Sequence, residues 1–146
     1  MNLDRDRSTG PPRILIVEDE PIIRRFYERF CAAQGYDPVL APSGNIAMEI
    51  LEAGRRFDVV LLDIRLPGVS GRELWKWIEL NRPELCGRVI MVTADILSES
   101  TREFIRKSGR PYLEKPFSTD QLTELIEGIL EAPSDRPGSN RRLGTS

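Results

Sequence analysis

Residues 59–63 read Val-Val-Leu-Leu-Asp, a run of four aliphatic side chains that ends in a carboxylate. Three further stretches place an apolar run before polar side chains: Ile-Leu-Ile-Val before Glu18-Asp19, Val-Ile-Met-Val before Thr93, and Pro-Tyr-Leu before Glu114-Lys115. In a parallel sheet that helices cover on both faces, the strands are such continuous apolar runs. The sequence therefore predicts a parallel sheet whose strands lead into polar side chains.

Helix signals alternate with these strand signals along the chain. The expected strands are 14–17, 37–41, 58–62, 88–92 and 111–113. Pro21 suits the first turn of a helix and Gly35 its C-cap. A second helix is expected from its cap at Ser43 to near Gly54, and a third continues through Trp77. The fourth spans about ten residues and ends near Gly109, and the last begins at a capping box formed by Ser118 and Gln121. Five strand–helix units predict an α/β fold, a doubly wound five-stranded parallel sheet with five helices.

Composition narrows the class of protein. Of the 146 residues, 40% are hydrophobic and 30% are charged, and the net charge of -2 predicts no nucleic-acid partner. No apolar stretch approaches the ~20 residues of a membrane span. Cys31 and Cys86 lack the spacing of a metal or disulfide motif, so we expect reduced thiols and a cytoplasmic protein without membrane attachment.

The polar ends of the chain differ from its middle. We expect residues 1–12 to form a disordered leader, residues 13–131 one folded domain, and residues 132–146 a flexible tail rich in Pro, Gly, Ser and Arg. No pattern of an additional output domain follows the last helix, which predicts a domain that acts on its own.

The polar residues that follow the strands form a chemically coherent set. Because ligands of such sheets bind at the carboxyl ends of the strands, Glu18, Asp19 and Asp63 are expected to meet there and to hold Mg²⁺. Asp63 can also attack phosphorus as a nucleophile and form an acyl phosphate. Thr93 and Lys115 would then contact phosphoryl oxygens. An ionised carboxylate has no proton to lose, so the absence of histidine from the chain does not impede this chemistry.

Each of these signals is weak alone. An acidic pair after a strand is more often a helix cap, an Asp or Thr at a strand end is usually a turn or capping residue, and Lys-Pro is common in loops. Their joint placement at the ends of four expected strands favours the phosphoryl site.

The motifs resemble the receiver domain of bacterial two-component response regulators, the CheY-like family. The resemblance covers roughly Arg13 to Glu131. It rests on four stretches: Ile-Val-Glu-Asp-Glu at 16–20, Leu-Leu-Asp-Ile-Arg-Leu-Pro-Gly at 61–68, Val-Thr-Ala at 92–94, and Tyr-Leu-Glu-Lys-Pro-Phe at 112–117. It implies a flavodoxin-like sheet with the strand order 2-1-3-4-5.

The same resemblance implies roles for individual residues. Asp63 would be phosphorylated by a sensor histidine kinase or a histidine phosphotransfer protein. The Mg²⁺ ligands would be Glu18, Asp19, Asp63 and the backbone carbonyl of Arg65. Thr93 and Tyr112 would be the switch pair, and Lys115-Pro116 would be a cis peptide that aims the lysine at the site.

Two features depart from the family's commonest pattern. Glu18 stands where Asp is also frequent, a substitution that the family tolerates. Gly109-Arg110-Pro111 replaces the usual loop before Tyr112 and is similar to receivers attached to hybrid histidine kinases. The proline removes a backbone donor at the start of the fifth strand. Whether phosphorylation drives a homodimer therefore stays open.

The resulting interpretation is a single-domain response regulator that switches its protein partners, or relays phosphoryl groups, in phosphorelay signal transduction. It would not be an enzyme beyond Mg²⁺-dependent self-phosphorylation and self-dephosphorylation, and its downstream target stays unknown. One alternative is a phosphorylation-independent adaptor, which predicts a damaged acidic pocket. Another is a phosphatase of the haloacid dehalogenase type, which requires an Asp two residues after the nucleophile, where this chain has Arg65.

A separate hypothesis concerns Arg65 and Asp95 and the lifetime of the acyl phosphate. Each lies two residues after a site residue, Asp63 and Thr93 respectively. The two side chains are expected to flank the mouth of the site, where they could pair and impede the water that hydrolyses the acyl phosphate. Two independent, solvated surface charges are the alternative.

Overall fold

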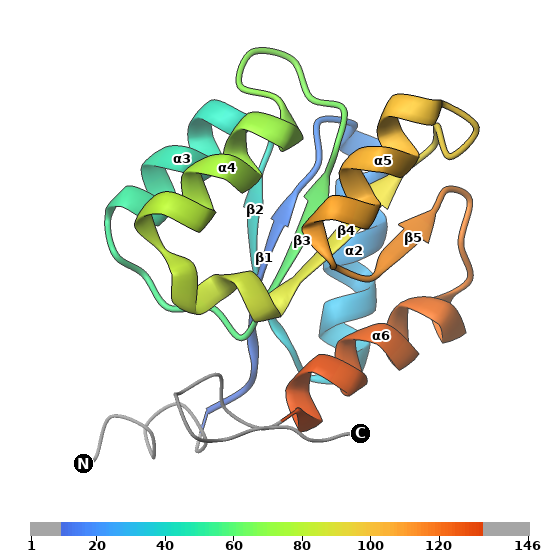
Figure 1. Cartoon of the computed structure of the whole chain (residues 1–146). Coiled ribbons are helices and arrows are strands. Elements are labelled where there is room, and N and C mark those ends of the chain that lie inside the picture. Colours follow the sequence, from blue (N-terminus) through green and yellow to red (C-terminus); the bar gives the residue numbers. More distant parts are fainter. Residues whose placement is uncertain (1–9, 133–146) are drawn as a thin grey trace.

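The computed structural model of the protein describes residues 10–132. The strands are β1 (Arg13–Val17), β2 (Asp37–Ala41), β3 (Val59–Asp63), β4 (Val89–Thr93) and β5 (Tyr112–Glu114). The helices are α2 (Pro21–Gln34), α3 (Gly44–Glu52), α4 (Gly71–Asn81), the 3₁₀ helix η1 (Pro83–Arg88), α5 (Glu99–Ser108) and α6 (Thr119–Glu131) (Figure 1). The expected leader and tail fall largely outside the described residues.

The strands form one parallel sheet in the order β2-β1-β3-β4-β5. This order confirms the doubly wound fold and the strand order that the resemblance implied. Val17 pairs with Leu62, and Asp63 pairs with Val92, so the carboxyl ends of β1, β3 and β4 lie side by side. The residues that follow these strands are thereby brought to one edge of the sheet.

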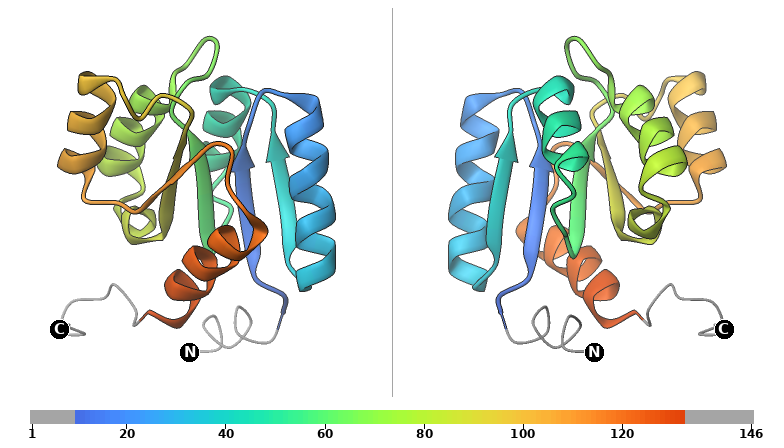
Figure 2. Two further views of the ribbon diagram at one scale, coloured as in Figure 1. Left: turned by 90° about the vertical axis from the view of Figure 1, so that its right-hand side faces the viewer. Right: turned by 90° about the vertical axis from the view of Figure 1, so that its left-hand side faces the viewer.

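Helices cover the sheet on both faces (Figure 2). Because successive strand side chains point to opposite sides, Leu15 and Val17 of β1 face a core shared with α3, α4 and α5, whereas Ile14 and Ile16 face a core shared with α2 and α6. Every residue of β3 and β4 is buried. This two-sided burial explains why the strands read as continuous apolar runs.

The helix boundaries follow the sequence signals at most ends. Gly35 and Gly109 are left-handed C-caps, Ser43 accepts a hydrogen bond from the Ile46 N–H, and Ser118 with Gln121 forms a capping box. Several expected strands are displaced by one residue, within the usual uncertainty of strand ends.

The expectation for the end of α4 was wrong. The helix continues past Trp77 to Asn81, because Ile78 extends the buried stripe. Arg82 is its C-cap, because the following Pro83 disfavours helical backbone at Arg82 and begins η1. This 3₁₀ helix was not predicted.

Gly71, at the start of α4, packs directly under the backbone of Asp63 and Ile64. A Cβ at residue 71 would meet the Asp63 carbonyl oxygen and would lie 2.6 Å from the Ile64 Cα. We expect Gly71→Ala to destabilise the fold by about 2–3 kcal/mol, because backbone must shift to admit the methyl group. Urea unfolding followed by circular dichroism measures the change.

Gly128→Ala is the matched control for that substitution. Gly128 lies within α6, and a Cβ added there would have no neighbouring atom within 4 Å. Alanine at this position should stabilise the helix by roughly 0.5–1 kcal/mol. Equal stability of the two variants would contradict the steric role of Gly71.

Candidate functional site

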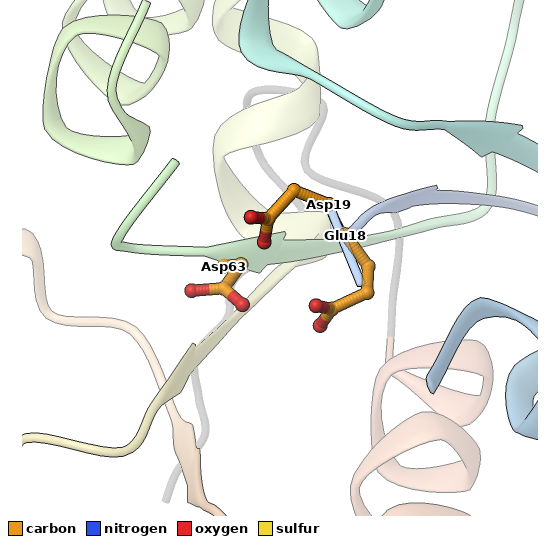
Figure 3. A group of neighbouring side chains, drawn as sticks. All are labelled: Glu18, Asp19 and Asp63. Carbon is orange, nitrogen blue, oxygen red and sulfur yellow. The ribbon is translucent and has the colours of Figure 1, made fainter. Parts of the chain in front are cut away.

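Three carboxylates meet at the carboxyl edge of the sheet. Glu18 and Asp19 directly follow β1, and Asp63 is the last residue of the neighbouring strand β3. One oxygen from each lies within 4.8 Å of the others (Figure 3). Glu18 and Asp63 are buried, with 1% and 5% of their surface exposed, whereas Asp19 is half-buried. The structure thus brings together the three acidic side chains singled out in the sequence.

Lys115 reaches this cluster from the segment after β5. Its Nζ donates to Asp63 Oδ2 at 2.7 Å and to Glu18 Oε1 at 2.9 Å. Its backbone N–H donates to the Thr93 carbonyl at 2.8 Å, which fixes the segment beside β4. The Lys115-Pro116 bond is cis, as the resemblance implied. The lysine therefore bridges two of the three carboxylates.

Burial and hydrogen bonding shift the pKa values of Glu18 and Lys115. The pKa of Glu18 is raised, chiefly because burial removes water from the carboxylate; the Lys115 hydrogen bond opposes this and the charge of Asp63 adds to it. Burial lowers the pKa of Lys115, but its hydrogen bonds with Asp63 and Glu18 outweigh burial, and the pKa is raised. Lys115 therefore stays protonated at neutral pH and balances part of the negative charge.

The second oxygen of Asp63 and the hydroxyl of Thr93 are held by backbone donors. Asp63 Oδ1 accepts from the Arg65 N–H at 3.0 Å, and Thr93 Oγ1 accepts from the Asp95 N–H at 2.9 Å. Thr93 is buried at the end of β4, and its hydrogen bond with Asp95 ties the hydroxyl to the loop that follows. Tyr112 is 45% exposed on β5, outside the acidic cluster.

Arg24 is a site neighbour that the sequence analysis missed. Its guanidinium, on α2, donates to the Glu18 carbonyl at 2.9 Å and so fixes the backbone between Glu18 and Asp19. No spacing rule connects a helical arginine to a particular carbonyl, because the contact depends on how α2 packs against β1.

The donor set fits Mg²⁺. This ion takes oxygen ligands, commonly one or two carboxylates, and keeps several waters. Glu18, Asp19 and Asp63 offer such oxygens within one small volume, and half-buried Asp19 leaves the site accessible to water. The compensation of Glu18 and Asp63 by Lys115 leaves an excess of negative charge to attract a cation.

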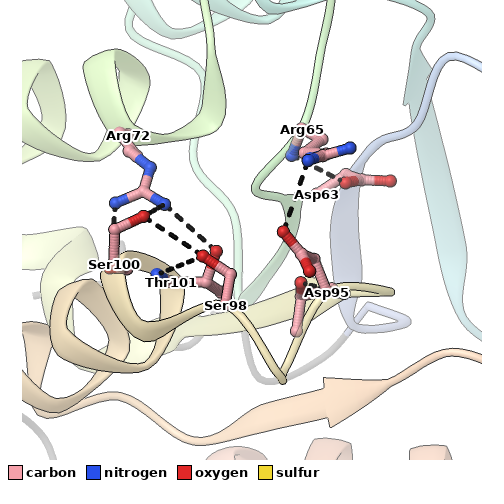
Figure 4. Close-up of polar contacts among 8 residues, drawn as sticks. Asp63, Arg65, Arg72, Asp95, Ser98, Ser100 and Thr101 are labelled. Atoms are coloured by element: carbon pink, nitrogen blue, oxygen red, sulfur yellow. Dashed lines mark hydrogen bonds and ion pairs between the residues drawn. The ribbon is translucent and has the colours of Figure 1, made fainter.

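A cleft of about 500 Å³ lies beside the carboxylates. Asp19, Arg65 and Asp95 contribute to its lining. Arg65 Nη2 and Asp95 Oδ2 are 3.3 Å apart, which confirms the expected pairing across the mouth of the site (Figure 4). The Arg65 side chain is 76% exposed, so solvent screens this ion pair.

No helix among residues 10–132 is long and apolar enough to cross a membrane.

Known proteins share the sequence pattern of this chain. The family model of the response regulator receiver domain matches residues 14–127. The regulatory protein AtoC of Escherichia coli K12 is 35% identical over 126 residues, which are 86% of this chain but only 27% of AtoC. The polar-differentiation response regulator DivK of Brucella anthropi is 32% identical over 121 residues, which are 82% of this chain and 97% of DivK.

The fold of this chain has a counterpart among solved structures. The receiver domain of the sensor histidine kinase PA1611 from Pseudomonas aeruginosa has a magnesium ion coordinated in its active site cleft. It matches this chain with a TM-score of 0.76 and 28% sequence identity, and the match covers 84% of this chain and 100% of that domain.

Proposed function

Because the chain belongs to the response regulator receiver domain family, we propose that it accepts a phosphoryl group on Asp63 from a sensor histidine kinase or a histidine phosphotransfer protein. The observation that carries this proposal is the convergence of Glu18, Asp19 and Asp63 with Lys115 at one edge of the sheet. The chemistry would be confined to the protein's own phosphorylation and dephosphorylation in the cytoplasm.

The chain's own residues account for the transfer. A carboxylate oxygen of Asp63 forms a bond to phosphorus while the bond from phosphorus to the donor's imidazole nitrogen breaks, and the electron pair returns to that nitrogen. Asp63 supplies an ionised oxygen, so no base removes a proton. The Lys115 ammonium, already 2.7 Å from Asp63, neutralises charge on a phosphoryl oxygen.

Glu18, Asp19, Asp63 and the backbone carbonyl of Arg65 would hold the Mg²⁺ ion. When bound, Mg²⁺ would reduce the repulsion between carboxylates and phosphoryl oxygens and stabilise the charge that develops during transfer. The chain keeps Asp63 oriented through the Arg65 N–H and holds the Glu18 backbone through Arg24.

Thr93 and Tyr112 would convert phosphorylation into a change of surface. The Thr93 hydroxyl would leave the Asp95 N–H and donate to the phosphoryl group, and the exposed ring of Tyr112 would turn inward behind it. The surface formed by α5, β5 and α6 would then bind a different protein partner. This is a two-state switch read out by protein–protein contacts.

Beryllofluoride, a mimic of the phosphoryl group, tests the proposed site without a kinase. We expect the full chain to bind it in titration calorimetry when Mg²⁺ is present and not when the metal is chelated. Failure to bind in Mg²⁺ would overturn the proposal. That result would favour the phosphorylation-independent adaptor. The complete set of three carboxylates and the lysine argues against this alternative.

The Arg65–Asp95 pair is expected to shield the acyl phosphate from water. Surface ion pairs contribute roughly 0.2–1 kcal/mol, so Arg65→Ala or Asp95→Ala should shorten the phosphoryl lifetime by about 1.4- to fivefold. Decay of the phosphorylated protein after removal of the phosphodonor, followed by intact-protein mass, measures the lifetime. Unchanged decay in both variants would leave the two residues as independent surface charges.

A further inference from the structure

Arg72 joins two helices that border the phosphoryl site. It lies in the first turn of α4, and its guanidinium donates to the Ser100 carbonyl at 3.2 Å, to Ser100 Oγ at 3.4 Å and to Thr101 Oγ1 at 3.1 Å (Figure 4). Its Cζ also lies 5.0 Å from the centre of the Phe104 ring. Thr101 is only 4% exposed, so its hydroxyl is a buried group held by a charged donor. All these contacts fall on the first turns of α5.

The first turn of α5 is connected to Thr93 by a series of hydrogen bonds between residues close in sequence. The Asp95 N–H donates to Thr93 Oγ1 at 2.9 Å, and the Ser98 N–H donates to the Asp95 carbonyl at 3.1 Å. Ser98 then caps α5 by accepting from the Thr101 N–H at 3.3 Å. A continuous set of contacts therefore runs from the Thr93 hydroxyl through the loop to Thr101 and Arg72.

We propose that Arg72 is a positioning residue that holds the first turn of α5, and through it Thr93, in the arrangement seen here, and so opposes occupation of the phosphoryl site. The inference rests on the proposed function. In the present structure the Thr93 oxygen accepts from the Asp95 N–H, and in the proposed switch the hydroxyl moves from this position to the phosphoryl group on Asp63. A ligand that binds better when this loop is displaced must supply the free energy of every contact that is made only in the loop conformation seen here.

The direction of the expected effect follows from this linkage. If the Arg72 contacts are weakened or lost when the loop moves, removing them lowers the stability of the resting arrangement more than that of the occupied one. Ligand binding at Asp63 then becomes tighter, by the same factor as the shift in the equilibrium between the two arrangements. A purely structural role for Arg72 predicts a less stable protein with unchanged ligand affinity.

Beryllofluoride affinity at saturating Mg²⁺, measured by calorimetry on the full chain, is the test. Arg72→Met keeps an apolar stem near Phe104 but removes the three hydrogen bonds. We expect it to bind beryllofluoride about five- to tenfold more tightly than the wild type, with unchanged affinity for Mg²⁺ alone. Arg72→Lys, which can still donate to Thr101, should stay closer to the wild type.

Arg106→Met is the matched control. Arg106 lies on the same helix as Thr101, but its guanidinium pairs with Glu103 of that helix, so its removal changes the charge without releasing α4 from α5. Thr101→Val provides a second variant should Arg72→Met not fold, and we expect it to bind beryllofluoride about two- to threefold more tightly, because it removes one of the Arg72 acceptors.

The outcomes separate this inference from the function on which it rests. Unchanged or weaker beryllofluoride binding by a folded Arg72 variant, or equal tightening in Arg106→Met, would overturn the role of Arg72 alone. Absence of binding by the wild-type chain would overturn the proposed function, and this inference with it.

Discussion

Replacing Asp63 with asparagine is expected to lower the rate of phosphorylation by more than about three orders of magnitude. The amide has no ionised oxygen to attack phosphorus, and it removes one of the three carboxylates that would hold the metal. The measurement is the intact-protein mass after incubation with acetyl phosphate and Mg²⁺. The wild type should gain one phosphoryl group, and neither the variant nor a metal-chelated sample should do so.

Asp120→Asn is the control for the general loss of a carboxylate. Asp120 is exposed in the first turn of α6 and is not one of the three carboxylates that meet at the edge of the sheet. This variant should be phosphorylated as fast as the wild type. A Mg²⁺-dependent adduct that persists in Asp63→Asn would assign the phosphoacceptor to another side chain. Samples are also quenched early, so that an adduct that hydrolyses quickly is still detected.

The fold and the acidic cluster were predictable for one physical reason. The strands β1, β3 and β4 are buried on both faces, so the sequence shows them as uninterrupted apolar runs. Once the strands are parallel, the side chains that follow them must meet at one edge. The convergence of Asp19, Asp63 and Lys115 therefore requires only the order of the strands, which the resemblance supplied.

Contacts set by the packing of helices were not predictable in the same way. Arg24 and Arg72 each bind a backbone carbonyl, and every residue has such a carbonyl, so the sequence carries no signal for the partner. The direction of the Thr93 hydroxyl depends on the fold of the following loop. The pairing of Arg65 with Asp95 was foreseen because each lies two residues after a site residue in the sequence.

Lys115→Met should destabilise the metal-free protein by about 3 kcal/mol, the lower end of the cost of breaking a buried ion pair. The substitution leaves Glu18 and Asp63 facing each other, with 1% and 5% of their surfaces exposed, without the ammonium that now bridges them. For a domain of this size the change corresponds to a fall of about 10 °C in the midpoint of thermal unfolding. Differential scanning calorimetry in the presence of a chelator measures it.

Lys107→Met is the matched control, because Lys107 pairs with Glu103 at 3.6 Å on an exposed helix face. Its loss should change the stability by less than about 1 kcal/mol.

Added Mg²⁺ should restore much of the stability that Lys115→Met loses. A divalent cation that binds only the folded chain stabilises it by mass action, and the variant's uncompensated carboxylates should bind that cation more tightly than those of the wild type. The rise in the unfolding midpoint with millimolar Mg²⁺ should therefore be larger in Lys115→Met than in the wild type. An equal rise would mean that the lysine does not share the carboxylates with the metal. Phosphorylation should stay strongly impaired even in Mg²⁺, because the metal replaces the charge of Lys115 in the resting site but not its contact with the incoming phosphoryl oxygen.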